Sequence, residues 1–268
     1  MARPLVTFTS DFGHHDWFVG VVHGVIHAVC PEARVVDLTH DIPPRHLARA
    51  AFVLEASAAD FPPGTVHLAV VDPGVGTDRR PLAVGSRGQF FVGPDNGLLE
   101  WAIAAPDAQV HAVTERRHFR EPVSRTFHAR DVFAPVAACL ARGEPLLGFG
   151  PRITDPVRLG VPGPRWVDGH LIGRIAFIDH FGNAITDLTE AHLREAFPGV
   201  PDTALRVVVA GRRLTGLARA YGDARVGALL VIVGSSGRLE IAQMGGDAAE
   251  RLGLGEGDEV AVGLAEPA

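Results

Sequence analysis

The stretch that organises this chain is Val70-Val71-Asp72-Pro73-Gly74-Val75-Gly76-Thr77-Asp78-Arg79-Arg80. It follows a short apolar segment, His67 to Val71, whose pattern predicts a buried strand. Because proline removes a backbone donor and glycine frees the backbone, we expect that strand to end at Asp72. Ligands bind at the carboxyl ends of strands in open α/β sheets, and Arg79 can return toward this carboxylate. The stretch therefore predicts a site, although a tight turn with an Asx-type hydrogen bond and solvated arginines explains the same residues.

Strand and helix patterns alternate on the amino-terminal side of this stretch. The expected order of strand, helix, strand and helix is Leu5 to Thr9, Trp17 to Cys30, Arg34 to Leu38 and Leu47 to Ser57. Further strands are expected at Leu82 to Gly85 and Gln89 to Val92, and a further helix at Val132 to Arg142. Alternation of this kind is typical of right-handed crossovers. We expect an α/β domain over residues 1–155 with a mainly parallel sheet.

The composition of the sequence changes between Pro151 and Pro164, where proline and glycine recur every few residues. Beyond it, short alternating segments are separated by glycine and aspartate turns. This pattern predicts a second domain over residues 165–268, an all-β barrel or sandwich.

The composition excludes several classes of protein. The 268 residues carry a net charge of −6, which disfavours nucleic acid and anionic membranes as partners. Lysine is absent, so Schiff-base and P-loop lysine chemistry are excluded. Only Cys30 and Cys139 occur, without a CxxC motif, and neither a signal peptide nor a membrane span is recognisable. We expect a cytoplasmic protein.

Three loops of the first domain hold candidate catalytic groups. They contain Asp11, then Asp72 with Arg79, then His128 with its neighbours Arg130 and Asp131. Because strand-end loops of a parallel sheet converge on one edge, these side chains can meet. Arginine would keep the carboxylate ionised, and histidine can exchange a proton near neutral pH. Taken singly, each group is explained as well by a structural ion pair.

The thirteen histidines raise the question of a metal site. His14, His15, His40 and His46 lie near carboxylates, and His23 and His27 share a helix face. No HExxH motif or closing carboxylate pattern accompanies them. We expect no metal.

Two stretches of the second domain are rich in polar groups. In the first, Phe177 to Leu188, Asn183 follows Gly182 and offers an amide that both donates and accepts, or simply tolerates a left-handed turn. The second, Gly234 to Ala242, fits a hairpin or the lining of a small-molecule pocket. GxGxxG after the first strand, GxxxxGK[ST] and GxSxG are all missing, which disfavours the usual nucleotide folds and serine hydrolases. These patterns alone indicate a soluble two-domain α/β enzyme.

Taken together, six motifs resemble the S-adenosylmethionine hydrolase (hydroxide adenosyltransferase) family, which is related to the fluorinase and chlorinase. They are Thr9-Ser10-Asp11-Phe12-Gly13, Val71-Asp72-Pro73-Gly74-Val75-Gly76, Gly93-Pro94-Asp95-Asn96-Gly97, Thr126-Phe127-His128-Ala129-Arg130-Asp131-Val132-Phe133-Ala134-Pro135, Asp179-x-Phe181-Gly182-Asn183 and Ser235-Ser236-Gly237. The resemblance implies a three-layer α/β domain followed by a β-barrel domain. It also implies homotrimers that bind S-adenosylmethionine between the first domain of one subunit and the second domain of a neighbour.

The resemblance also implies roles for residues of five of these motifs and for Arg79. Asp72, Arg79 and His128 would activate a water that attacks the 5′ carbon of S-adenosylmethionine, giving adenosine and L-methionine. The remaining matched residues would bind the substrate, without any cofactor: Asp11, Phe127, Asp179, Phe181, Asn183 and Ser235. Two alternatives stay open. One is an adenosyl transferase that uses chloride or fluoride, and the other is a non-catalytic protein that binds S-adenosylmethionine or adenosine.

Overall fold

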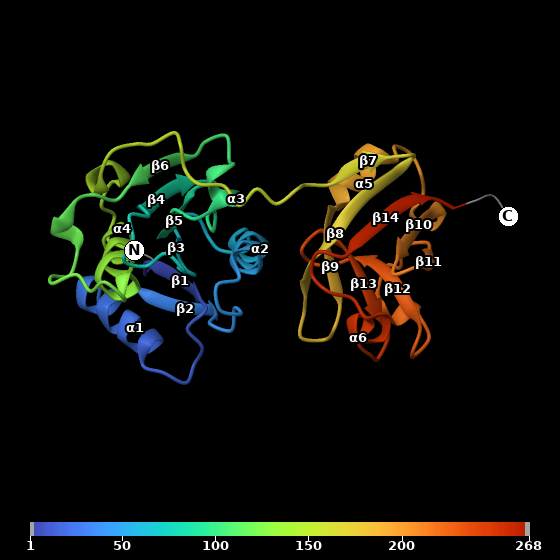
Figure 1. The fold of residues 1–268 in the computed structure, drawn as a ribbon, viewed down its shortest axis with the longest axis horizontal. Helices are drawn as coiled ribbons and strands as arrows, with labels where there is room; N and C mark the ends of the chain where they lie inside the picture. The colour runs from blue at the N-terminus through green and yellow to red at the C-terminus, as the bar shows by residue number, and fades with distance from the viewer. Residues whose placement is uncertain (1–2, 266–268) are drawn as a thin grey trace. The chain divides into compact units, whose positions relative to one another are not determined.

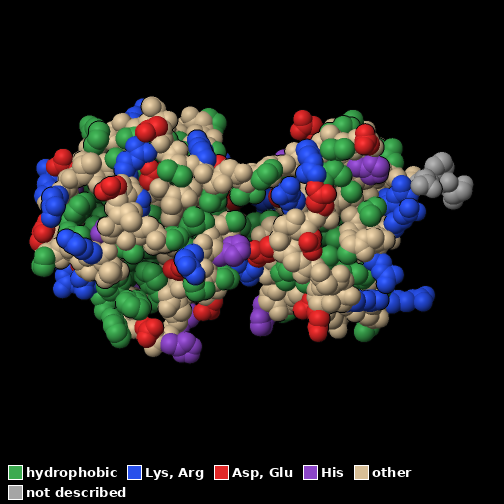
Figure 2. Space-filling view, viewed as in Figure 1, with side chains coloured by type: hydrophobic (Ala, Val, Ile, Leu, Met, Phe, Trp, Pro, Cys, Tyr) green, Lys and Arg blue, Asp and Glu red, His purple; other side chains and the backbone are tan. Residues whose placement is uncertain are grey.

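The computed structural model describes residues 3–265 and divides after Gly160 into two compact units (Figure 1). The division falls close to the end of the proline- and glycine-rich segment. In the sequence, this segment separates the part that predicts alternating strands and helices from the part that predicts short strands. On the face seen in Figure 2, arginine and acidic side chains are interspersed over both units. No helix among residues 3–265 is long and apolar enough to span a membrane.

A six-stranded sheet forms the centre of the first unit, in the order β2-β1-β3-β5-β4-β6. Its strands are β1 Leu5–Ser10, β2 Arg34–Thr39, β3 Val66–Val70, β4 Pro81–Ser86, β5 Gln89–Pro94 and β6 Gln109–Ala112. The pairs β1/β2, β1/β3 and β3/β5 are parallel, whereas β4 pairs antiparallel with β5 and β6. The sheet is therefore mixed.

The antiparallel half begins at a tight hairpin between β4 and β5. Its two turn residues, Arg87 and Gly88, both have positive φ, 55° and 74°. Such turns match the right-handed twist of paired strands, so they return the chain directly to its neighbour. The sequence indicated both strands, but the turn reverses the direction of β4 relative to β5.

Two apolar cores flank this sheet because side chains alternate along each strand. Helices α1 Phe18–Val29 and α4 Ala134–Ala141 pack with Val6, Phe8 and Leu68 in one core. Helices α2 Leu47–Ala58 and α3 Glu100–Ile103 pack with Ala69 and Val71 in the other. Short 3-10 turns lie at Arg116–His118, Leu146–Phe149, Asp202–Ala204 and Tyr221–Asp223.

Helix α4 begins later than its apolar pattern indicates. A π-helical turn, Ala129–Phe133, precedes it and includes Asp131. The Asp131 side chain is buried, lies 2.7 Å from Arg130 Nε and accepts a 2.8 Å hydrogen bond from Ser124 N. Asp131 therefore anchors the preceding loop through direct hydrogen bonds, in addition to any favourable contact with the helix dipole.

The second unit is built on one antiparallel sheet, ordered β11-β10-β14-β8-β9-β13-β12, with β7 paired to β8. Its strands are β7 Arg165–Val167, β8 His170–Ile178, β9 Ala184–Thr189, β10 Leu205–Val209, β11 Arg212–Thr215, β12 Leu229–Val233, β13 Arg238–Gln243 and β14 Glu259–Leu264. Two short helices, α5 Glu190–Ala196 and α6 Ala248–Leu252, accompany the sheet. The strand pattern did not anticipate α5, which begins where the Thr189 side chain accepts from His192 N.

Candidate active site

Asp72 and Arg79 form a nearly buried ion pair just beyond the end of β3. Arg79 Nε donates to Asp72 Oδ1 and Oδ2 at 2.9 and 3.0 Å, and Arg79 Nη2 also contacts Oδ2. The two side chains are 9% and 6% exposed, so solvent screens the pair only weakly. The guanidinium also lies over the ring of Phe133, 4.9 Å from its centroid. The contact is thus directional, and it holds both groups in one plane.

The glycines between these two residues allow the chain to fold back. A Cβ on Gly74 would lie 3.2 Å from Arg79 Cγ. Gly76 has a φ of 79°, and a Cβ there would lie 2.2 Å from the carbonyl oxygen of Arg125. Thr77 Oγ1 closes the turn by donating to Gly74 O at 2.7 Å. Only glycine permits this close approach of the loop to the segment that leads to His128.

His128 joins the ion pair through Arg79. Arg79 Nη2 lies 3.0 Å from His128 Nδ1. Because an arginine can only donate, Nδ1 acts as the acceptor and the ring proton of the neutral imidazole resides on Nε2. Burial, followed by the charge of Arg79, lowers the pKa of His128 below 6.5. His128 is therefore neutral at pH 7 and presents Nε2–H as a donor.

Asp11 and Phe127 line the same small cavity as Asp72 and His128. The cavity measures about 170 Å³ and also includes Phe12, Phe18, Arg45, Val70, Pro73, Val75, Thr126 and Ala129. The Asp11 carboxylate follows β1, and its Oδ2 accepts from Arg45 N at 2.9 Å. Phe127 packs edge-on against Phe18, with centroids 5.2 Å apart. The convergence expected for a parallel sheet edge thus brings these residues together.

The adjacent Arg80 turns away from the cavity. It contacts Asp95 Oδ2 through Nε at 2.8 Å and Asp155 Oδ1 through Nη1 at 2.9 Å. Beside it, Asn96 Nδ2 donates to Val71 O at 2.9 Å and so satisfies the last carbonyl before Asp72. The sequence singled out this Asp95-Asn96 motif without a role. Its contacts show that it supports the loop that carries Asp72.

In the second unit, Asp179 and Asn183 form one hydrogen-bonded turn between β8 and β9. Asp179 Oδ1 accepts from the backbone N–H groups of Phe181 and Asn183 at 2.8 and 2.9 Å, and Oδ2 accepts from Asn183 Nδ2 at 2.9 Å. Asn183 is 7% exposed, whereas Phe181 is 73% exposed. The backbone carbonyl of Asn183 accepts from Asp179 N, so the turn leaves the side-chain Oδ1 of Asn183 and the Phe181 ring for contacts with a ligand.

Ser235 lies in a different turn, between β12 and β13. That turn adjoins the end of β9, because Glu190 N donates to Gly237 O at 2.8 Å, whereas Asn183 precedes the start of β9. β9 has six residues, so its first and last residues lie about 16 Å apart. Ser235 therefore comes from a different turn than Asp179 and Asn183, and its neighbour Gly234 adjoins the Glu240 side chain.

The same unit holds a buried acid that the sequence did not single out. Tyr221 Oη donates to Glu240 Oε1 at 2.6 Å, and Glu240 is 4% exposed. Burial raises the pKa of Glu240, and the neighbouring charge of Asp179 raises it further. A glutamate in the middle of a strand gives no signal of this kind until its burial is known.

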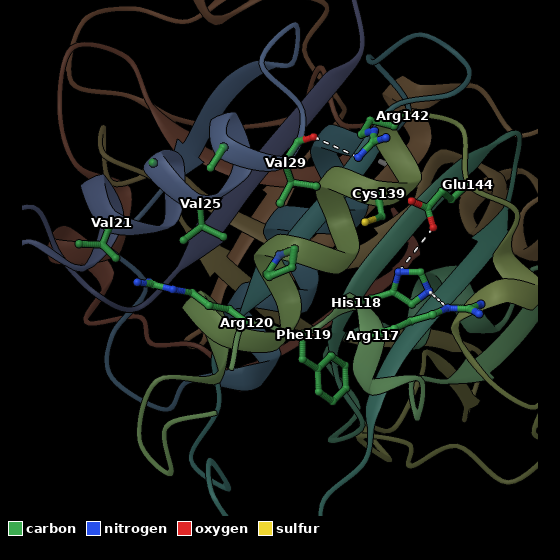
Figure 3. A pocket seen from close by; sticks show the side chains of 13 residues that line it. Val21, Val25, Val29, Arg117, His118, Phe119, Arg120, Cys139, Arg142 and Glu144 are labelled. Atoms are coloured by element: carbon green, nitrogen blue, oxygen red, sulfur yellow. Dashed lines mark hydrogen bonds and ion pairs between the residues drawn. The ribbon is translucent and has the colours of Figure 1, made fainter. Parts of the chain in front are cut away.

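A wider cavity of about 970 Å³ lies beside α1 and α4 in the first unit (Figure 3). Its polar groups are largely engaged with one another: Arg117 Nη2 donates to Gly148 O at 3.1 Å, and His118 Nδ1 lies 3.5 Å from Glu144 Oε2. Burial raises the pKa of Cys139 to about 12, so this thiol is not a nucleophile at neutral pH. The cavity contains none of the Asp11, Asp72 and His128 side chains, and the smaller cavity is the better candidate for chemistry.

Two family models match the chain, one in each unit. The family model described as the SAM hydroxide adenosyltransferase N-terminal domain matches residues 6–150, and that of the C-terminal domain matches residues 173–261. An (R)-S-adenosyl-L-methionine hydrolase of Salinispora tropica is 43% identical over 97% of both chains. One from Thermus thermophilus is 42% identical, covering 95% of this chain and 97% of its own.

More distant relatives and a solved structure extend the comparison. A fluorinase of Nocardia brasiliensis is 30% identical over 97% of both chains. The crystal structure of an uncharacterised conserved protein from Thermotoga maritima has a TM-score of 0.90 at 37% identity, covering 96% of this chain and 99% of its own. By sequence and by fold, the chain belongs to the SAM hydroxide adenosyltransferase family.

Proposed function

We propose that this protein hydrolyses S-adenosyl-L-methionine at the 5′ carbon and releases adenosine and L-methionine. The observation that carries the proposal is the continuous contact from Asp72 through Arg79 to His128, beside a cavity that Asp11 also lines. The hydrolase relatives are named for the (R) configuration at sulfur, and we extend that configuration to the substrate of this protein.

The substrate chemistry needs little from the enzyme on the leaving-group side. A sulfonium departs as a neutral thioether, so no general acid is required. The attacking side needs a water held in line with the carbon–sulfur bond and partly removed from bulk solvent. As the carbon–oxygen bond forms, that water becomes strongly acidic, and a nearby carboxylate suffices to take its proton.

The tautomer of His128 assigns the roles within the triad. Because Nδ1 accepts from Arg79, Nε2–H is free to donate to the water oxygen and orient it. Asp72 then takes the proton through Oδ1, which accepts only from Arg79 Nε and keeps a second lone pair. Arg79 acts as a positioning residue that holds the two groups in register. No metal or cofactor takes part in this scheme.

Asp11 binds the ribose hydroxyls in this proposal. Its Oδ2 accepts one hydrogen bond from Arg45 N, which orients the carboxylate and leaves Oδ1 and the second lone pair of Oδ2 for a bidentate contact with a diol. The ring of Phe127 offers an aromatic face to the sulfonium, a favourable contact for a cation. Asp179, Phe181 and Asn183 bind the adenosyl part, and Ser235 contacts a more distant part of the same extended ligand.

We further propose that the protein is a homotrimer whose sites combine the first unit of one subunit with the second unit of a neighbour. The 170 Å³ cavity supports this proposal, because pockets for ligands of this size occupy roughly 300–1,000 Å³. The cavity of the first unit alone is therefore too small to hold S-adenosylmethionine. Mixing inactive Asp72→Ala and Asn183→Ala proteins, with subunit exchange, should restore activity, and a single-subunit site predicts none.

The layers of the first unit and the closure of the second are also part of the proposal. We infer three layers in the first unit, since apolar cores lie on both sheet faces, and a closed barrel in the second. The bridge between Ala218 and Ile232, which connects the segment after β11 to β12, supports closure. We place the protein in the cytoplasm without a nucleic-acid or membrane partner, and its two free cysteines suit that compartment.

The first test is the detection of adenosine after incubation with S-adenosylmethionine in buffer free of halide. A halide-dependent transferase would produce no adenosine there and would require added chloride or fluoride. A binding protein would produce none under either condition. Asp72→Ala and His128→Ala should each lower turnover by about 10²–10⁴-fold while retaining ligand affinity, and normal turnover in both would overturn these roles.

A further inference from the structure

Three potential metal ligands converge in the first unit, outside the proposed catalytic triad. His23 comes from α1, Asp37 from β2, and His40 directly follows β2. Asp37 Oδ1 lies 2.8 Å from His23 Nε2 and 3.1 Å from His40 Nε2, and all three donor atoms lie within 4.8 Å of one another. His23 and Asp37 are partly accessible, with side chains 29% and 33% exposed, so the cluster opens to solvent on one side.

His40 is fully buried, and only one of its ring nitrogens has a hydrogen-bond partner. Its Nδ1 lies 2.7 Å from Ser10 Oγ. Its Nε2 is aimed at Asp37 but has no hydrogen-bond partner within residues 3–265. A buried polar atom without a partner is costly. If Nδ1–H donates to Ser10, the Nε2 lone pair faces a carboxylate, and a bound cation satisfies both groups, whereas the opposite tautomer turns Nε2–H toward Asp37.

The spacing of the donor atoms fits such a cation. With metal–ligand bonds of about 2.1 Å, neighbouring donor atoms lie roughly 3.0–3.4 Å apart in octahedral or tetrahedral coordination. The two measured separations of 2.8 and 3.1 Å lie close to the octahedral value. A histidine that binds a metal also normally donates its other ring N–H to a neighbour, which is the role open to Ser10.

We propose that His23, Asp37 and His40 form a binding site for a divalent transition-metal ion, which two imidazoles and one carboxylate would hold. The ion joins α1 to the end of β2 and, through Ser10, to the tip of β1 that carries Asp11. Its role is to brace this edge of the sheet, and it is independent of the proposed hydrolysis. This proposal departs from the expectation of no metal in the sequence analysis, where His23 and His27 were noted only as sharing a helix face.

A second group of three donors, His118, Cys139 and Glu144, is a weaker candidate. Three arginines, Arg117, Arg120 and Arg142, line the cavity beside it (Figure 3), and their charges disfavour a bound cation. The Cys139 thiol is protonated at neutral pH because burial raises its pKa. This group nevertheless supplies a control, because Cys139→Ser should leave metal binding at the first cluster unchanged.

The test is a titration of chelator-treated, metal-free protein with Co²⁺, followed by its visible absorption, and with Zn²⁺ in competition. We expect one Co²⁺ per chain. His23→Ala and Asp37→Asn should each weaken binding at least about 100-fold, and Ser10→Ala about 10-fold or more through its contact with His40. His27→Ala and Cys139→Ser should bind as the unchanged protein does.

Three results would overturn the site: no saturable binding by the unchanged protein, equal loss in His27→Ala, or loss only in Cys139→Ser. The second would assign the ion to a His23/His27 pair on the helix surface. Thermal unfolding supplies an independent readout, because an ion that binds only the folded state raises Tm. Zn²⁺ should raise the Tm of the unchanged protein but not that of Asp37→Asn, and an equal rise in both would contradict the proposal.

Discussion

Arg79 Nη2 lies 3.0 Å from His128 Nδ1, while the same guanidinium contacts both oxygens of Asp72. One arginine thus fixes the orientation of a carboxylate and the tautomer of an imidazole. The two groups come from loops 56 positions apart in the sequence (128 − 72 = 56). Their relative position therefore depends on a planar group with several donors, which lysine cannot replace.

Arg79→Lys should lower kcat about 100-fold or more, with a smaller change in KM, because a single ammonium cannot hold both partners. Steady-state kinetics of adenosine release measure both constants. Arg80→Lys is the matched control, since Arg80 contacts Asp95 and Asp155 away from the cavity. Equal losses of kcat in the two variants would contradict the role assigned to Arg79.

The pH dependence should report the ionisation of His128. Its pKa lies below 6.5, so the neutral form persists at pH 7 and above and disappears as the pH falls through that pKa. Protonation places a second N–H against Arg79 and breaks the contact. We expect kcat/KM to be flat from neutral to mildly alkaline pH and to fall about tenfold per pH unit on the acid side. A rate that increases on acidification would exclude the neutral histidine.

Asp11→Asn should raise KM by about 10- to 100-fold and change kcat less, because the amide keeps the shape of the side chain but offers only one acceptor oxygen to a diol. A similar increase is expected in the Kd of adenosine, measured by calorimetry. Asp41→Asn, in a neighbouring exposed loop, should leave both constants unchanged. If Asp11→Asn binds adenosine normally, the ribose contact is wrong.

Gly76→Ala should destabilise the first unit and reduce activity together. The new Cβ would meet the Arg125 carbonyl oxygen at 2.2 Å, in a backbone conformation with φ of 79°. We expect a loss of at least about 1–3 kcal/mol in the free energy of unfolding, measured with denaturant. Gly88→Ala is the comparison, because its φ is similar, 74°, but its Cβ would meet only Pro63 Cβ at 3.8 Å. The difference between the variants isolates the steric contact.

The sequence predicts those features that depend on local rules. The proline and glycines that follow Asp72 predict that a strand ends there. The geometry of parallel strands predicts that Asp11, Asp72 and His128 converge. Asp11 and His128 do line one cavity with Asp72. The barrel or sandwich texture of the second unit was likewise visible in its short strands and turns.

Other features depend on contacts that no local pattern encodes. His23, Asp37 and His40 meet because a helix, a strand and a loop pack together, and sequence spacing pairs His23 with His27 instead. Arg79 and Arg80 are adjacent and chemically identical, yet they point to different partners. Glu240 is buried in mid-strand beside Tyr221, where an alternating pattern gives no indication of a hydrogen bond.

The most direct test of the central claim follows the oxygen atom of the attacking water. S-adenosylmethionine is incubated with the protein in halide-free water labelled with oxygen-18, and the adenosine formed is examined by mass spectrometry. The account predicts one heavy oxygen at the 5′ position of every adenosine released by the enzyme, and little labelled product with Asp72→Ala. Adenosine without the label, or no adenosine at all, would contradict it.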